Sequence, residues 1–118
     1  MLVNIVRWRV RKENSQKQLD FWREVLDYQR SHREIFHYTR SRFYTMTEEG
    51  SSEEHWMFLD EYDNREAYDK MRNAIEQDPE LVKMNIQRHS KWDPMRVPDS
   101  FKAELWTERV RVDLKKQA

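Results

Sequence analysis

The sequence has no cysteine and, among its 118 residues, only one glycine and three prolines. Without cysteine the chain contains no disulfide, no thiolate nucleophile and no cysteine-ligated zinc or iron–sulfur site. One glycine cannot build the phosphate-binding loops of P-loop and dinucleotide-binding proteins, because those loops need several glycines for close backbone approach. Nucleotide-dependent enzymes of these two types are therefore not expected.

The sequence also lacks an excess of charge of one sign and a long hydrophobic run. The 22 Lys and Arg residues equal the 22 Asp and Glu residues in number, so no net charge attracts nucleic acid or an anionic membrane. Asn4, Arg7 and Arg9 interrupt the apolar N-terminal run, and nowhere do about 20 apolar residues follow one another, as a membrane span requires. We expect a soluble cytoplasmic protein without a membrane partner.

Aromatic residues are abundant, at 13% of the chain, and charged residues make up 37%. Disordered chains avoid aromatic side chains, because these bury large areas when a protein folds. A chain of this length buries roughly two-thirds of its unfolded surface, which supports one core. We therefore expect one folded domain over residues 1–118 with a strongly charged exterior.

Alternating apolar residues predict four strands, over residues 2–10, 36–46, 55–62 and 101–114. Helical spacing predicts one helix over residues 15–32 and a second helical segment, from Asn64 to about His89, that is broken near Asp78. Gly50 lies between the second and third strands, where a hairpin turn needs a positive φ. The order β-α-β-β-α-β predicts the ferredoxin-like α+β fold, a four-stranded antiparallel sheet with both helices on one face.

Both sides of this sheet carry apolar residues. In the first and third strands one row contains the aromatic residues Trp8, Trp56 and Phe58, and the opposite row contains the aliphatic residues Val3, Ile5, Met57 and Leu59. If the helices cover the aromatic row, the aliphatic row is bare in a monomer. Two copies packed sheet against sheet would cover it, so the sequence predicts a homodimer.

Two segments carry a resemblance to a known superfamily. They are REIFHYTRSRFY at residues 33–44, followed by the Gly50 turn, and WMFLDEYDNREAYDKM at residues 56–71, followed by DPELVKM. Here the chain resembles the dimeric α+β-barrel superfamily, particularly its antibiotic-biosynthesis-monooxygenase-like and NIPSNAP-like members. The resemblance implies a dimeric barrel with a pocket beside an acidic residue of the third strand and the aromatic residue two places later, here Asp60 and Tyr62. Some members oxidise quinols or polyketides without a cofactor, others cleave haem, and others have no known chemistry.

The sequence departs from the superfamily pattern in its second helix and at the haem-binding positions. Met71 stands where many oxygenase-like members have a histidine. Haem-degrading relatives use an asparagine on the first strand, a tryptophan at the end of the third and a histidine that ligates iron. Here Asn4 lies on that strand at a shifted position, Tyr62 replaces the tryptophan, and the ligand position falls near Met84 or Asn85. We expect neither haem nor another cofactor.

Asp60 is the first candidate catalytic residue. It lies in a row of aromatic residues, where a carboxylate without partners costs several kcal/mol to bury or has a raised pKa. A raised pKa suits a general acid or base near neutral pH. The alternative is an ion pair with an arginine such as Arg7 or Arg40.

The second candidate catalytic residue is His89, on the predicted helical face of Val82 and Ile86, where it would line the pocket and shuttle protons. The alternative is a hydrogen-bonded structural histidine. The candidate ligand-binding residues are Asn4, Trp22, Tyr28 and Tyr62, and for the aromatic ones the alternative is core packing. The other histidines, His32, His37 and His55, lack the i, i+4 partner of a helical metal site, so we expect no metal.

The leading hypothesis is a protein that encloses an aromatic or apolar small molecule. If it is an enzyme, the resemblance implies a cofactor-independent oxygenase-like reaction on a quinol-like substrate. The alternative is a non-catalytic protein whose barrel serves dimerisation or ligand carriage. RNA-binding domains share the element order, but the third strand lacks their glycine–aromatic signature, and Asp60, Glu61 and Asp63 lie where phosphate would bind. Nucleic acid is therefore an unlikely partner.

Overall fold

The chain forms strands and helices in the order that its sequence predicts. The computed structural model describes residues 1–115. The elements are β1 (Leu2–Arg11), η1 (Lys12–Asn14), α1 (Ser15–Ser31), α2 (Arg33–Phe36), β2 (Arg40–Thr47), β3 (Glu53–Tyr62), α3 (Arg65–Gln77), α4 (Pro79–Trp92), η2 (Asp93–Met95) and β4 (Lys102–Thr107). All neighbouring strands are antiparallel, in the order β2-β3-β1-β4. The predicted ferredoxin-like α+β fold is confirmed.

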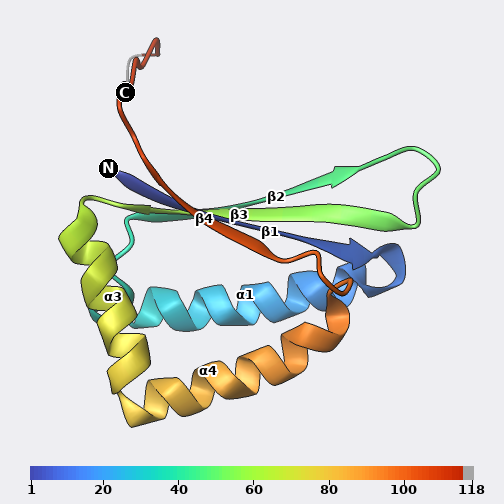
Figure 1. The fold of residues 1–118 in the computed structure, drawn as a ribbon, viewed down its shortest axis with the longest axis horizontal. Helices are drawn as coiled ribbons and strands as arrows, with labels where there is room; N and C mark the ends of the chain where they lie inside the picture. The colour runs from blue at the N-terminus through green and yellow to red at the C-terminus, as the bar shows by residue number, and fades with distance from the viewer. Residues whose placement is uncertain (116–118) are drawn as a thin grey trace.

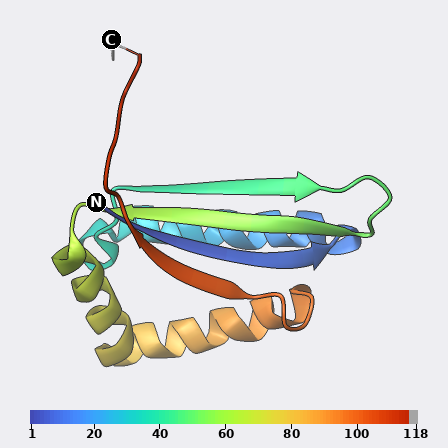
Figure 2. The ribbon, with the colours of Figure 1, turned by 45° about the horizontal axis from the view of Figure 1, so that its top comes forward.

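The long helices lie on one face of the sheet (Figure 1). Helices α1 and α4 run beneath the strands, and α3 stands at one end (Figure 2). The aromatic row of β1 and β3 faces them, with Trp8 and Trp56 almost fully buried. Within residues 1–115, no helix has both the length and the apolar character needed to cross a bilayer.

A polar row divides the core into two clusters. The first cluster surrounds Trp8 and Trp56, and the second surrounds Tyr62. Between them, the strand register places Asp60 directly opposite Asn4 on β1 and Ser41 on β2. Because alternate residues of a strand share a face, these three side chains project toward the helices and interrupt the apolar layer.

Gln18 joins three elements in the first cluster. Its side chain is fully buried, and its Oε1 accepts hydrogen bonds from the indole nitrogens of Trp8, at 2.5 Å, and Trp92, at 3.0 Å. Buried polar groups need such partners, because leaving one unpaired costs about 1–3 kcal/mol. Gln18 therefore fixes the end of α4 against α1 and β1.

The predicted turn and helix starts are confirmed. Gly50 has a φ of 78° in the β2–β3 hairpin. The Asn64 side chain caps α3 by accepting a hydrogen bond from the backbone nitrogen of Ala67, at 2.9 Å. Asp78 caps α4, whose first residue is Pro79. The break in the second helical segment therefore lies where the sequence places it.

The predicted strand over residues 36–46 is wrong for its first four residues. Phe36 ends the short helix α2 and packs into the second core cluster. His37 follows with a φ of 58°, in the left-handed region, which interrupts an extended chain. Strand β2 consequently begins only at Arg40.

The predicted strand over residues 101–114 is also too long. Thr107, the last residue of β4, pairs with Leu2, the first residue of β1. The Glu108 backbone nitrogen still donates to the Met1 carbonyl at 2.9 Å, but β1 offers no partner beyond it. The following segment leaves the sheet on the side away from the helices (Figure 1). Its exposed apolar residues are Val110, Val112 and Leu114.

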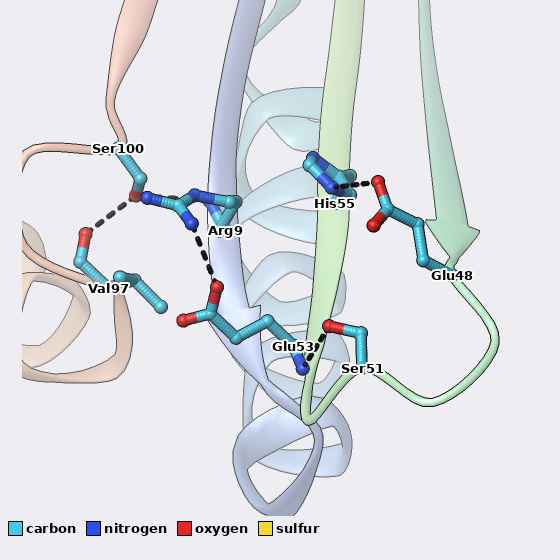
Figure 3. Close-up of polar contacts among 7 residues, drawn as sticks. All are labelled: Arg9, Glu48, Ser51, Glu53, His55, Val97 and Ser100. Carbon is cyan, nitrogen blue, oxygen red and sulfur yellow. Dashed lines mark hydrogen bonds and ion pairs between the residues drawn. The ribbon is translucent and has the colours of Figure 1, made fainter.

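The second face of the sheet has no helical cover. Its aliphatic residues are half-buried, and its most exposed large apolar residues are Tyr44, Met46 and Trp106, the last with 55% of its surface exposed. Cross-strand ion pairs join Arg7 to Glu104, Arg9 to Glu53 and Arg42 to Glu61. Figure 3 shows the pair of Arg9 and Glu53, at 2.9 Å, near that of His55 and Glu48. This face therefore combines exposed apolar side chains with three cross-strand ion pairs.

Candidate functional site

A cavity of about 210 Å³ lies between the sheet and the helices α1 and α4. Its aromatic lining residues are Phe21, Trp22, Phe43, Phe58, Trp92 and Phe101, and its polar ones are Gln29, Ser41, Asp60, Asn85, Arg88 and His89. An apolar lining with a few polar groups is typical of small-ligand sites. Since a cavity of roughly 150 Å³ holds benzene, this one has room for a ligand of about one or two aromatic rings.

Asp60 contributes the only carboxylate of this lining. Its Oδ1 atom is buried and has no hydrogen-bond partner among residues 1–115. Burial raises the pKa of Asp60 from 3.8 to about 6, and a hydrogen bond from Ser41 offsets part of the rise. Near neutral pH the carboxylate is therefore ionised yet more basic than an exposed one, as a general base requires.

The arginine pairing considered for Asp60 is wrong. Arg7 belongs to the opposite row of β1 and forms its ion pair with Glu104. Arg40 is in register with Glu61, the residue after Asp60, and so also belongs to the opposite row. Because successive side chains of a strand point to opposite faces, neither arginine lies on the face of Asp60.

Trp22 lines the same cavity from α1. Its ring lies 5.2 Å from that of Phe43 and 5.3 Å from that of Phe58, between centroids. Its indole nitrogen is buried without a partner in the described part of the chain. The lining residues thus include a buried donor on α1 and a buried acceptor on β3 that have no partner within residues 1–115.

His89 lies at the solvent end of the lining. Its side chain is 46% exposed, and its Nδ1 is 3.5 Å from an oxygen of Asp93. The helical face predicted for it is wrong in part, because Ile86 is 66% exposed. The buried residues of α4 are Leu81 and Trp92, three helical turns apart, and they define a face adjacent to the predicted one. His89 is therefore placed between the cavity and solvent.

Three predicted ligand-binding residues do not line the cavity. Asn4 stands beside Asp60 on β1. Tyr62 is buried in the second core cluster, where burial and the charge of Asp60 raise its pKa above the ordinary range. Tyr28, on α1, stacks on the ring of His32, with 4.0 Å between the ring centroids. Direct contact of these three residues with a ligand remains a prediction.

Sequence reasoning missed Ser41 and Arg88. Ser41 is opposite Asp60, a pairing that follows from the hairpin register once both strand ends are known. Arg88 lines the cavity from α4, and burial lowers its pKa, with Tyr28 and Glu24 offsetting part of the change. The spacing of Leu81 and Trp92 would have indicated the correct helix face. Within residues 1–115, no three His, Asp or Glu side chains are grouped to hold a metal ion.

No protein-family model and no curated protein matches this sequence. Among solved structures, the chain is similar to the crystal structure of an antibiotic biosynthesis monooxygenase, with 14% identity, a TM-score of 0.57, and 93% of this chain and 100% of that chain covered. It is also similar to a Deinococcus radiodurans protein provisionally assigned the same name, with 11% identity, a TM-score of 0.60, and 98% and 100% covered. At these identities the likeness shows the fold, which is the one that the sequence resemblance implies.

Proposed function

We propose that this protein binds an aromatic molecule of one or two rings in the cavity and that Asp60 acts on it as a general base. The observation that carries the proposal is that two residues lining one aromatic cavity, Asp60 and Trp22, each have a buried polar group without a partner within residues 1–115. A phenol or quinol matches both groups, because its hydroxyl donates one hydrogen bond and accepts another.

Transfer of a proton from the phenol to Asp60 is unfavourable in free energy, but groups of the cavity offset part of the cost. A phenol with a pKa of about 10 is about four pK units weaker as an acid than Asp60, which corresponds to about 5 kcal/mol. The Trp22 N–H and the cationic Arg88, which both line the cavity, stabilise the phenolate that forms. Asp60 receives the proton, and His89, at the solvent end, passes it to water.

The names of the structural neighbours suggest the reaction of the deprotonated ligand. A quinol anion transfers electrons to dioxygen, a carbon–oxygen bond forms at the ring, and loss of water leaves a hydroxyquinone. One oxygen atom enters the product and the other leaves as water. The quinol supplies all four electrons, so the balance requires no cofactor. This is the cofactor-independent, monooxygenase-like reaction that the fold resemblance implies.

We also infer that two copies pair through the uncovered sheet face. Tyr44, Met46 and Trp106 expose large apolar groups there, and the charged residues between them are paired across strands. Contact with a second copy therefore buries apolar surface together with charges that are mostly paired, as an isologous interface favours. The segment beyond Thr107, which exposes apolar residues, projects on this side of the sheet (Figure 1). A second copy on this face would also bury part of that segment.

Oxygen uptake with a panel of quinols tests the reaction. We expect uptake with one-ring and two-ring quinols, weaker uptake with three-ring anthrone-like phenols, and loss of uptake in Asp60→Asn. His89→Ala slows the reaction without abolishing ligand binding. Asp63→Asn is the matched control, because Asp63 is an exposed carboxylate three residues away.

The binding and oxygen-uptake results together distinguish catalysis from ligand carriage. Saturable binding of quinols without oxygen uptake by any of them overturns catalysis and leaves ligand carriage. If no aromatic ligand of the panel binds, the proposed function is wrong in both forms.

A further inference from the structure

An arginine-lined hollow adjoins the cavity. Its volume is about 650 Å³, and it shares Leu26, Gln29 and Ser41 with the cavity lining. The second half of α1, the helix α2 and the start of β2 form its walls. Because Ser41 is also the cross-strand neighbour of Asp60, a ligand seated beside Asp60 can extend past Ser41 into this hollow.

The hollow is strongly basic in a protein without net charge. Its four arginines are Arg23, Arg30, Arg33 and Arg40, and its one carboxylate is that of Asp27. Asp27 pairs with Arg30, at 3.0 Å. Across residues 1–115, the other three arginines have no carboxylate within 4.0 Å. Arg40 projects to the opposite face of the sheet, so the guanidinium groups of Arg23 and Arg33 are the ones available to an anion that enters from solvent.

The charges of the cavity and of the arginine-lined hollow determine how a ligand is oriented. The ionised Asp60 repels an anionic group from the cavity, and the unpaired Arg23 and Arg33 attract it to the hollow. The aromatic lining of the cavity packs against the ring of the ligand. The arginines of the hollow bind a carboxylate, because a guanidinium donates two parallel hydrogen bonds to it. A ligand that satisfies both compartments has its carboxylate and its phenolic hydroxyl at opposite ends.

We propose that the ligand is an aromatic carboxylic acid, with its hydroxylated ring beside Asp60 and its carboxylate in the arginine-lined hollow. This inference rests on the proposed function and adds the substrate class to it. The arginines contribute affinity and orientation, and they take no part in the proton transfer.

Two fluorescent probes test the inference because they differ only by a carboxylate. 6-Hydroxy-2-naphthoate has its hydroxyl and its carboxylate at opposite ends, and 2-naphthol lacks the carboxylate. We expect the naphthoate to bind at least about tenfold more tightly than the naphthol, the ratio that one or two charge-assisted hydrogen bonds give. Raising the salt from about 50 to about 500 mM should weaken only the naphthoate, because salt screens exposed charges.

Arginine variants locate the effect. Arg23→Gln combined with Arg33→Gln should remove the preference for the naphthoate and leave the affinity for naphthol unchanged. The matched control, Arg65→Gln combined with Arg72→Gln, makes the same change in net charge on α3, where both arginines are exposed and ion-paired. It should preserve the preference.

Each result has one meaning. Equal affinities of the wild type for the two probes overturn this inference and leave the proposed function intact, as does an equal loss in the control variant. Failure of both probes to bind overturns the proposed function itself. Circular dichroism of each variant shows whether the fold is kept.

Discussion

Ser41 is the direct cross-strand partner of Asp60, and it is also a wall shared by the aromatic cavity and the arginine-lined hollow. With Asn4 on the other side of Asp60, these residues form a polar row between two apolar clusters. A polar row in that position weakens the core, and a folded protein keeps such a feature where it serves a site. The row therefore has measurable consequences for both stability and ligand binding.

Asp60 should make the protein less stable as the pH rises. Its pKa is raised from 3.8 to about 6, so between these values the folded state binds more protons than the unfolded state. Stability is then full below about pH 4 and falls as the pH approaches and passes 6. At pH 7 the free energy of unfolding of Asp60→Asn should exceed that of the wild type by about 2–3 kcal/mol. At pH 4 the two free energies of unfolding should be nearly equal.

Urea unfolding at the two pH values measures this difference. Asp63→Asn changes an exposed carboxylate of the same type and should show no comparable dependence. A variant Asp60→Asn that is destabilised at pH 7 would mean that the carboxylate has a stabilising partner.

Replacing Trp22 by phenylalanine should weaken ligand binding without destabilising the fold. The change keeps an aromatic ring and removes the indole N–H, which has no partner among residues 1–115. We expect a several-fold lower affinity for 2-naphthol, since a net hydrogen bond contributes about 0.5–1.5 kcal/mol. Fluorescence titration gives the affinity, and Trp106→Phe, on the opposite face, should leave it unchanged. Equal affinity in Trp22→Phe would show that the ligand does not use this donor.

Gln18→Leu should destabilise the fold by about 2–4 kcal/mol, because it leaves two buried indole N–H groups unpaired. These groups belong to Trp8 and Trp92, which both donate to Gln18. Gln16→Leu, at an exposed position of the same helix, is the control. Thermal unfolding followed by near-ultraviolet circular dichroism compares the two. A small effect of Gln18→Leu would mean that other groups or water satisfy the indoles.

Trp106→Glu should dissociate the dimer that we infer. The change places a charge on the surface that a second copy would cover, where an unpaired buried charge is strongly unfavourable. Ile86→Glu is the control, because Ile86 is also an exposed apolar residue but lies on the helical side. Sedimentation equilibrium at micromolar concentration should give a dimer for the wild type and for Ile86→Glu, and a monomer for Trp106→Glu. A monomeric wild type contradicts the dimer.

The fold could be predicted from the sequence because its signals are local. Two-residue alternation identified the strands, Asn64 and Pro79 identified the helix starts, and Asp60 was found because a carboxylate is unusual among aromatic residues. The end of β4 was missed because it depends on where β1 begins, and no local signal marks it.

The site was only partly predictable for a similar reason. The arginine-lined hollow combines residues of α1, α2 and β2, so it exists only once these elements are packed together. The short helix α2 was read as strand because Phe36 and Tyr38 alternate with polar residues, whereas burial of Phe36 selects a helical turn. The cavity face of α4 was misassigned by one position because two neighbouring faces both carry apolar residues.

Occupation of the cavity can be measured directly by titrating the protein with 2-naphthol and following the indole ¹H–¹⁵N resonances of its five tryptophans. Trp22 and Trp92 line the cavity, and Trp106 lies on the opposite face of the sheet and serves as an internal control. Single Trp→Phe variants assign the resonances. We predict a saturable shift of the Trp22 and Trp92 signals with no change in that of Trp106. A shift confined to Trp106, or no indole shift at the solubility limit of the ligand, would contradict a ligand site beside Asp60.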